Sequence, residues 1–186
     1  MMFRILLICF FIVHFNMMST AASMGDINQI RKEFNLALND EKKAVVLFNQ
    51  LTKMKPATNT LQYAYLGATE AVLAKHAFNP FSKLTYVNSA LIKLNKAVEL
   101  NLNSIEIRYM RFSIESNMPS YLGYSKHAEE DKNILVKGLS TTKITKEQCG
   151  MYKVFANGII NSKYCNKQEE NLLHNVITAC NDLQLN

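Results

Sequence analysis

Residues 107–124 read IRYMRFSIESNMPSYLGY, and the first part has the pattern of a helix that is largely apolar but charged along one side. At about 100° per residue, Arg108, Arg111 and Glu115 lie within about 60° of one another around that helix. The run Asn117-Met118-Pro119-Ser120 then ends it, because proline has no amide proton for a further turn. The stretch therefore predicts a packed helix with one polar side, followed by a short connection that contains two tyrosines around a glycine.

The same helical spacing of apolar residues continues on both sides of this stretch, and no segment shows the alternation of a half-buried strand. We expect eight helices, at about 27–38, 40–55, 59–76, 81–101, 104–116, 126–139, from 145 and from 166. Thr145 with Gln148, and Asn166 with Glu169, have the spacing of capping boxes for the last two. Short connections predict an all-α antiparallel helical-hairpin stack. We expect it to form a single domain over residues 24–186.

Two of these helices show which side chains we expect inside. The predicted inward side of the second helix carries Val45, Phe48 and Leu51. That of the long fourth helix carries Leu84, Val87, Leu91, Leu94 and Val98. Both sets recur at the spacing of one helical face, which is the pattern of a helix packed on a core.

The N-terminus has the three-part pattern of a secretory signal peptide. Arg4 supplies a positive charge, residues 5–15 are an almost unbroken apolar run, and small and polar residues follow at 19–23. The apolar run is short for a bilayer span, which needs about 20 residues. We therefore expect residues 1–23 to be removed by cleavage near Ala22 or Ser23, with an uncleaved membrane anchor as the alternative. The mature chain would be periplasmic or secreted and without a transmembrane segment.

The mature chain would carry a net charge of about +5, which is the formal +6 of the whole chain less Arg4. Its lysines form no dense tract alternating with aromatic residues, so we do not expect a nucleic-acid partner. Three cysteines remain, Cys149, Cys165 and Cys180, and one pair could form a disulfide in an oxidising compartment. Their spacing does not fit a zinc site. We expect at least two of them to be small buried side chains.

One helix pair contains an internal pattern. Tyr63-Ala64-Tyr65-Leu66-Gly67 is followed by Ala90, Leu94, Ala97 and Leu102. Residues 61–116 resemble a tetratricopeptide repeat, in which small residues at such positions let two helices pack closely. The chain departs from the repeat in length, because 23 residues separate Gly67 from Ala90, against about 12 in the repeat. The hairpin is therefore expected to be about three turns longer.

Four further segments, YLGATEAVLAKH, NPFSKLTYV, EIRYMRFSIESNMPSYLGYSKH and EEDK, carry a second resemblance. Together they resemble an uncharacterised family of exported, tetratricopeptide-like helical proteins from Bacteroidetes-type bacteria. The resemblance covers most of the mature chain. It implies an exported, repeat-like helical fold and carries over no catalytic residue.

The charged side of the helix at 104–116 is the strongest candidate site in the sequence. If the repeat register continues, Arg108, Arg111 and Glu115 point inward, where an unpaired charge would be strongly destabilising. Acidic partners are available in Glu70, Glu129, Glu130 and Asp131. One interpretation is a structural ion-pair network, with Arg111 and Glu115 as an i, i+4 pair. The other is a pocket for an anion or carboxylate, with Tyr121 and Tyr124 at its rim.

No pattern in the sequence points to catalysis, a metal or a cofactor. The glycines are scattered singly, Gly-x-Ser-x-Gly is absent, and His127 with Asp131 lacks a third ligand. We therefore expect an interaction or scaffold protein that binds a peptide or protein partner in the cell envelope. The partner would lie on a concave surface lined by the first helix of each pair. The first alternative is a small-molecule binding protein that holds an anionic ligand with Arg108, Arg111, Tyr121 and Tyr124. A weaker alternative is a hydrolase with dispersed catalytic residues.

Overall fold

The computed structural model describes residues 26–185, and this part of the chain is all-α. Its helices are α1 (Ile27–Ala37), α2 (Glu41–Leu51), α3 (Thr60–His76), α4 (Pro80–Leu100), α5 (Ile105–Asn117), α6 (Ala128–Thr141), α7 (Cys149–Ile160) and α8 (Lys167–Leu185), with a 3-10 helix, η1 (Ser120–Leu122), after α5. None of the described residues forms a strand. The predicted all-α class is confirmed. The expected signal peptide lies outside the described residues.

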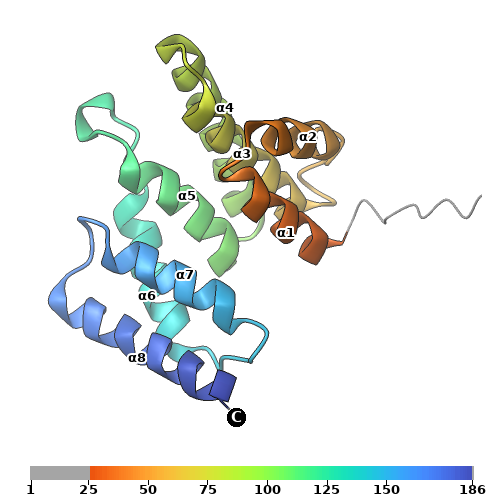
Figure 1. Ribbon diagram of the computed structural model, residues 1–186. Helices are drawn as coiled ribbons and strands as arrows, with labels where there is room; N and C mark the ends of the chain where they lie inside the picture. Colours follow the sequence, from red (N-terminus) through yellow and green to blue (C-terminus); the bar gives the residue numbers. More distant parts are fainter. Residues whose placement is uncertain (1–25, 186) are drawn as a thin grey trace, which may run out of the picture.

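The helices form a stack of antiparallel hairpins (Figure 1). Each of α1 to α5 packs on the next helix in the chain. α1 also packs on α3, and α3 on α5, so the odd-numbered helices form one layer of this part of the stack. At the C-terminal end, α6 and α7 both pack on α8. The predicted helical-hairpin stack is therefore confirmed.

Gly67 permits the close approach of α3 and α4, which form a long hairpin. A Cβ atom at this position would lie 3.0 Å from the backbone oxygen of Ala90, 3.1 Å from Cβ of Lys93 and 3.2 Å from Cγ of Leu94. Contacts this short would force one helix to shift. The absence of a side chain at Gly67 therefore sets the distance between the two helices.

Side-chain caps explain where several helices begin. Asp26, Asp40, Asn79 and Ser104 each accept a hydrogen bond from a backbone N–H of the following turn. Before α8, Asn166 Oδ1 accepts a hydrogen bond from Glu169 N at 3.0 Å, and Glu169 Oε2 accepts one from Asn166 N at 2.9 Å. This reciprocal pair is the capping box predicted for the last helix, which is confirmed.

The predicted start of the seventh helix at Thr145 is wrong, because α7 begins at Cys149. Gln148 Oε1 accepts a hydrogen bond from Thr145 N at 3.2 Å, which is one half of the expected capping box. The Thr145 carbonyl accepts a hydrogen bond from Gln148 N at 3.1 Å, which closes a turn. Residues 146–148 consequently form a turn, and the regular helix starts only after them.

The buried side chains form two main clusters that meet at α5. The first joins α1 to α5 and includes Leu47, Leu66, Leu94, Ile107 and Met110. The second joins α5 to α8 and includes Phe112, Leu135, Phe155, Ile159 and Leu173. Since α5 contributes to both, it is the element through which the two halves of the stack are held together.

Two residues predicted to face inward are exposed. In α2 the buried face is made by Ala44, Leu47 and Leu51, and Val45 on the adjacent stripe faces out. In α4 the predicted stripe is buried except for Leu84, which lies near the free end of the α3–α4 hairpin. Helical periodicity identifies the apolar side of a helix but does not fix its edge, as Val45 shows, or where the helix extends beyond its neighbours, as Leu84 shows.

The three cysteines within residues 26–185 divide into two buried side chains and one that is partly exposed. Cys149 and Cys180 are fully buried in the second cluster and contact each other through their sulfur atoms. Cys165 is partly exposed after α7. All three are free thiols in this structure. Burial raises the pKa of Cys180 to about 12 and also raises that of Cys165, which the nearby Glu169 raises further.

In the reduced, folded protein we expect an alkylating reagent to modify Cys165 much faster than Cys149 or Cys180. The thiolate must be accessible to react, and both core cysteines are fully buried. Burial also raises the pKa of Cys180, which lowers its thiolate fraction. Intact mass against time and peptide mapping would measure the order, with the unfolded protein as the control in which all three react. Modification of Cys180 at the rate of Cys165 would contradict this arrangement.

Candidate functional site

Both arginines of the predicted site are buried and paired with one carboxylate from α6. Asp131 Oδ1 accepts hydrogen bonds from Arg108 Nη1 at 2.6 Å and Arg111 Nη2 at 2.8 Å, and its Oδ2 accepts one from Arg111 Nε at 2.7 Å. Asp131 is 0% exposed. Burial alone would lower the pKa of Arg111, but its hydrogen bonds to Asp131 raise it overall. The three side chains therefore act as a charged link between α5 and α6.

Other donors of the two arginines are also occupied. Arg108 Nε donates to the Leu102 carbonyl at 2.6 Å, and its Nη1 lies 3.0 Å from Glu130 Oε1. Arg111 Nη1 donates to Asn95 Oδ1 at 3.0 Å. Because both guanidinium groups are almost fully buried and already bonded, they match the structural interpretation of this side of α5.

Glu115 pairs with the start of α6, whereas the sequence suggested an i, i+4 pair with Arg111. Its Oε2 accepts a hydrogen bond from the backbone N of His127 at 2.6 Å, and its Oε1 lies 2.8 Å from His127 Nδ1. Its backbone carbonyl accepts a further bond from the Ser125 hydroxyl. Glu115 thus fixes the chain that enters α6.

The two tyrosines are not gathered with the arginines. Tyr121 lies on η1 and is 85% exposed. Tyr124 is partly buried and packs against a small third cluster that contains Val87 and Leu91 of α4. Gly123 between them has a φ of 70°, which favours glycine. The five residues of the predicted site therefore divide between an ion-pair network, an exposed turn and a hydrophobic contact.

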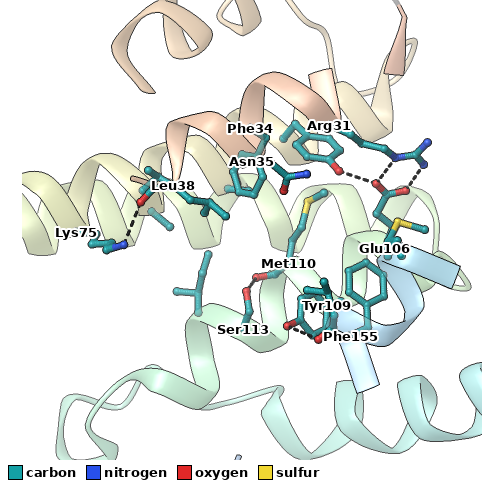
Figure 2. Close-up of a pocket in the computed structure, with 18 residues that line it drawn as sticks. Arg31, Phe34, Asn35, Leu38, Lys75, Glu106, Tyr109, Met110, Ser113 and Phe155 are labelled. Carbon is teal, nitrogen blue, oxygen red and sulfur yellow. Dashed lines mark hydrogen bonds and ion pairs between the residues drawn. The ribbon is translucent and has the colours of Figure 1, made fainter. Parts of the chain in front are cut away.

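A groove on the opposite side of α5 is the best candidate for binding (Figure 2). This inner groove has a volume of about 580 Å³. Its lining comes from α1, α3, α5 and α7 together with Leu38, the residue after α1. The expectation of a hollow lined by the first helix of each pair is thereby confirmed. Each of the four hairpins contributes a helix to the groove.

The walls of the inner groove are mostly apolar. Phe34 and Leu38 line it from the α1 side, and Met110 and Ile114 line it from α5 (Figure 2). Val154, which is 59% exposed, extends the apolar wall along α7. Binding of an apolar partner to such a surface is favourable, because it removes apolar surface from water.

Stacked aromatic rings hold α7 against α5 and so shape one wall. The rings of Tyr109 and Phe155 are stacked with centroids 4.1 Å apart. A Cβ atom at Gly158 would clash with the Tyr109 hydroxyl, so this glycine makes room for the ring. Burial raises the pKa of Tyr109. The wall at α7 is therefore set by side-chain packing between helices that are distant in the sequence.

A hydrogen-bonded cluster closes one end of the inner groove. Glu106 Oε1 accepts bonds from Arg31 Nε at 2.8 Å and Tyr65 OH at 2.6 Å, and Glu106 Oε2 accepts one from Arg31 Nη2 at 2.5 Å (Figure 2). Burial and the Glu106 charge raise the pKa of Tyr65, and the hydrogen bond to Glu106 raises that of Arg31. Arg31 and Glu106 compensate each other's charge, so this end is polar without a free charge.

A lysine stands at the other end. Lys75 Nζ donates to the Leu38 carbonyl at 2.9 Å (Figure 2). His76 Nε2 lies 3.4 Å from the Ala37 carbonyl. These are the last carbonyls of α1, which a cation favours through the helix dipole. Lys75 is exposed and forms no ion pair with another described residue. The inner groove therefore has one end at which an anionic group of a ligand would be favoured.

Within residues 26–185, no group of three or more histidine, cysteine, aspartate or glutamate side chains could hold a metal ion. No helix in the same range has both the length and the apolar character to cross a bilayer. Comparisons with protein-family models, curated proteins and solved structures find no match to this chain.

Proposed function

We propose that this protein is an interaction protein that binds an apolar segment of a partner polypeptide in the inner groove. The observation that carries the proposal is the groove itself, whose apolar walls come from four separate hairpins. Stacks of helical hairpins commonly bind extended partners on the surface formed by the first helix of each pair. The volume of about 580 Å³ is within the usual range for a binding site.

The side chains that line the groove suit a polypeptide with several apolar residues. Met110 and Met151 line two of the walls, and methionine adapts its shape to varied apolar partners. Arg31 and Glu106 neutralise each other at one end, so only Lys75 at the other end favours a charge. We therefore expect apolar side chains in the middle of the bound segment and an acidic group near Lys75.

We further propose that the protein works after export and belongs to the tetratricopeptide-like class. The apolar run at 5–15, followed by small residues, supports export to the cell envelope or beyond. The pattern that begins at Tyr63, together with the close helix contact at Gly67, supports a repeat-like α3–α4 hairpin. The resemblance to exported helical proteins of Bacteroidetes-type bacteria points the same way.

Binding of displayed peptides, selected on residues 24–186, would test the groove. Gly150 lines the groove, and a Cβ atom there meets no other atom within 4 Å. Gly150→Leu therefore adds a side chain at the groove without a packing clash. We expect this variant and Val154→Asp to weaken a selected peptide by about tenfold or more. Ile92→Asp, on the exposed side of α4, is the matched control and should bind normally.

Two results would contradict the proposal. Selected peptides that bind the two groove variants as tightly as the wild type would show that they use another surface. A rise in melting temperature with small organic anions, in the absence of any peptide binding, would favour a small-molecule binding protein, because a ligand of the folded state raises its stability. Far-UV circular dichroism of each variant would establish that its fold is intact.

A further inference from the structure

The free end of the α3–α4 hairpin presents two aromatic side chains to solvent. Phe78, in the connection, is 100% exposed, and Phe81, in the first turn of α4, is 80% exposed. We call residues 75–84 the hairpin tip. Single exposed apolar residues are common on protein surfaces, but two phenylalanines three positions apart at a protruding end favour contact with another surface.

The hairpin tip has a defined backbone. Asn79 caps α4, with its side chain accepting a hydrogen bond from Phe81 N at 2.8 Å. Pro80 follows as the first helical residue, where its fixed backbone angle suits a helix start. At the other side of the turn, the Ala77 amide donates to the Leu73 carbonyl at the end of α3. The two rings are therefore held on a capped turn, which lowers the entropy lost when they are buried by a partner.

The hairpin tip carries lysines and no carboxylate. Residues 71–98 contain no aspartate or glutamate, and Lys75 and Lys83 of the hairpin tip are both exposed. The connection between α5 and α6 has the same character. Residues 116–128 contain no acidic residue, and Lys126 is exposed.

The two connections lie at the same end of the stack (Figure 1). Met118 and Tyr124, on either side of η1, pack against Val87 and Leu91 of α4. Tyr121 on η1 is as exposed as the tip phenylalanines, so this end combines protruding aromatic residues with lysines. Aromatic and basic side chains are the residue types found where proteins meet the surface of a lipid bilayer.

We infer that this end of the protein binds the surface of a bilayer that contains anionic lipids. Phe78 and Phe81 would enter the boundary between headgroups and acyl chains, and Lys83 and Lys126 would lie against the lipid phosphates. A bilayer fits these observations better than a protein partner, because the hairpin tip protrudes and neither phenylalanine lines the inner groove. A fluid surface requires no matching shape. The inference does not depend on what the inner groove binds.

Sedimentation with lipid vesicles would test this inference. The protein would be residues 24–186, which contain all the described helices and leave out the apolar run at 5–15, which could itself bind lipid. The vesicles would be phosphatidylcholine alone or phosphatidylcholine with phosphatidylglycerol. We expect binding to the mixed vesicles only, and weaker binding at high salt because salt screens the lysines. Lys83→Glu with Lys126→Glu should remove it.

The decisive comparison is between two double variants. Phe78→Ser with Phe81→Ser should weaken binding by about tenfold or more. The control is Val46→Ser with Leu102→Ser, which removes apolar side chains that are 57% and 58% exposed away from the hairpin tip, and should bind normally. All four side chains are exposed, so neither variant should unfold the protein. Thermal melting would verify this.

Three outcomes would overturn the inference. They are no binding to the mixed vesicles, equal binding by the phenylalanine variant and the wild type, and equal binding to neutral vesicles. Loss of a protein partner from the phenylalanine variant, without any vesicle binding, would also overturn it and assign the hairpin tip to that protein.

Discussion

Replacing Asp131 with asparagine is expected to lower the free energy of unfolding by about 3–5 kcal/mol. The substitution keeps the size of the side chain but removes the charge that holds Arg108 and Arg111 at 2.6 and 2.7 Å. Both guanidinium groups would remain buried beside a neutral amide. Since domains are stable by only about 5–15 kcal/mol, this is a large fraction of the total. Thermal or urea unfolding would measure it, and we expect a fall in melting temperature of about 6–20 °C.

Glu130→Gln is the matched control for Asp131. Glu130 is adjacent in the sequence and also contacts Arg108, but its side chain is 57% exposed. We expect a loss of at most about 1 kcal/mol, as for other exposed ion pairs. Arg111→Ala should behave like Asp131→Asn, because it leaves Asp131 with only part of its compensating charge. An almost unchanged melting curve for Arg111→Ala would contradict the structural role and return Arg111 to the candidates for ligand binding.

The substitution Gly67→Val is expected to cost about 3 kcal/mol, at the upper end of the range for overpacked sites. Even the first added carbon would lie 3.0 Å from the Ala90 backbone oxygen. A branched side chain would have to push α3 away from α4, and both helices belong to the first hydrophobic cluster. Unfolding in urea would give the change in free energy, and a fall in the slope of the transition would indicate loosened packing.

The matched control for Gly67 is Gly150→Ala. Gly150 also lies in a helix, but a Cβ atom there meets open space. Removing a helical glycine without a clash should stabilise the protein by up to about 1 kcal/mol. If Gly67→Val were tolerated as well as Gly150→Ala, the close contact between α3 and α4 would be refuted.

The charged side of α5 could be recognised in the sequence, but its partners could not be chosen. Helical spacing predicts that Arg108 and Arg111 lie on the same side of α5, and the sequence offers four acidic residues as possible partners. Which one meets them depends on the rotation of α6 about its own axis, and Asp131 and Glu130 differ by about 100° in that rotation. The sequence predicts an ion pair between Glu115 and Arg111, because residues four apart are neighbours on one helix. Such pairs contribute only about 0.2–0.5 kcal/mol, so the contact with His127 across the connection could replace it.

The inner groove could be expected as a class of surface but not as a set of residues. Helical hairpins in sequence predicted a hollow lined by first helices. Met110 and Phe34, however, have the same spacing as core residues, and periodicity cannot separate a groove wall from a buried contact. Whether these residues line a groove or are buried depends on the distance between α7 and α1. The Tyr109–Phe155 stack and the space at Gly158 determine where α7 packs.

The packing of each helix mainly on its neighbours in sequence has a consequence for how the chain folds. Contacts between adjacent helices close short loops, so little chain entropy is lost before they form. Proteins rich in such local contacts fold rapidly. A hairpin such as α3–α4 can form as soon as its two helices are available, without waiting for residues from the far end. This order of assembly is compatible with the proposed export, in which the chain would cross a membrane unfolded and take up its structure on the other side.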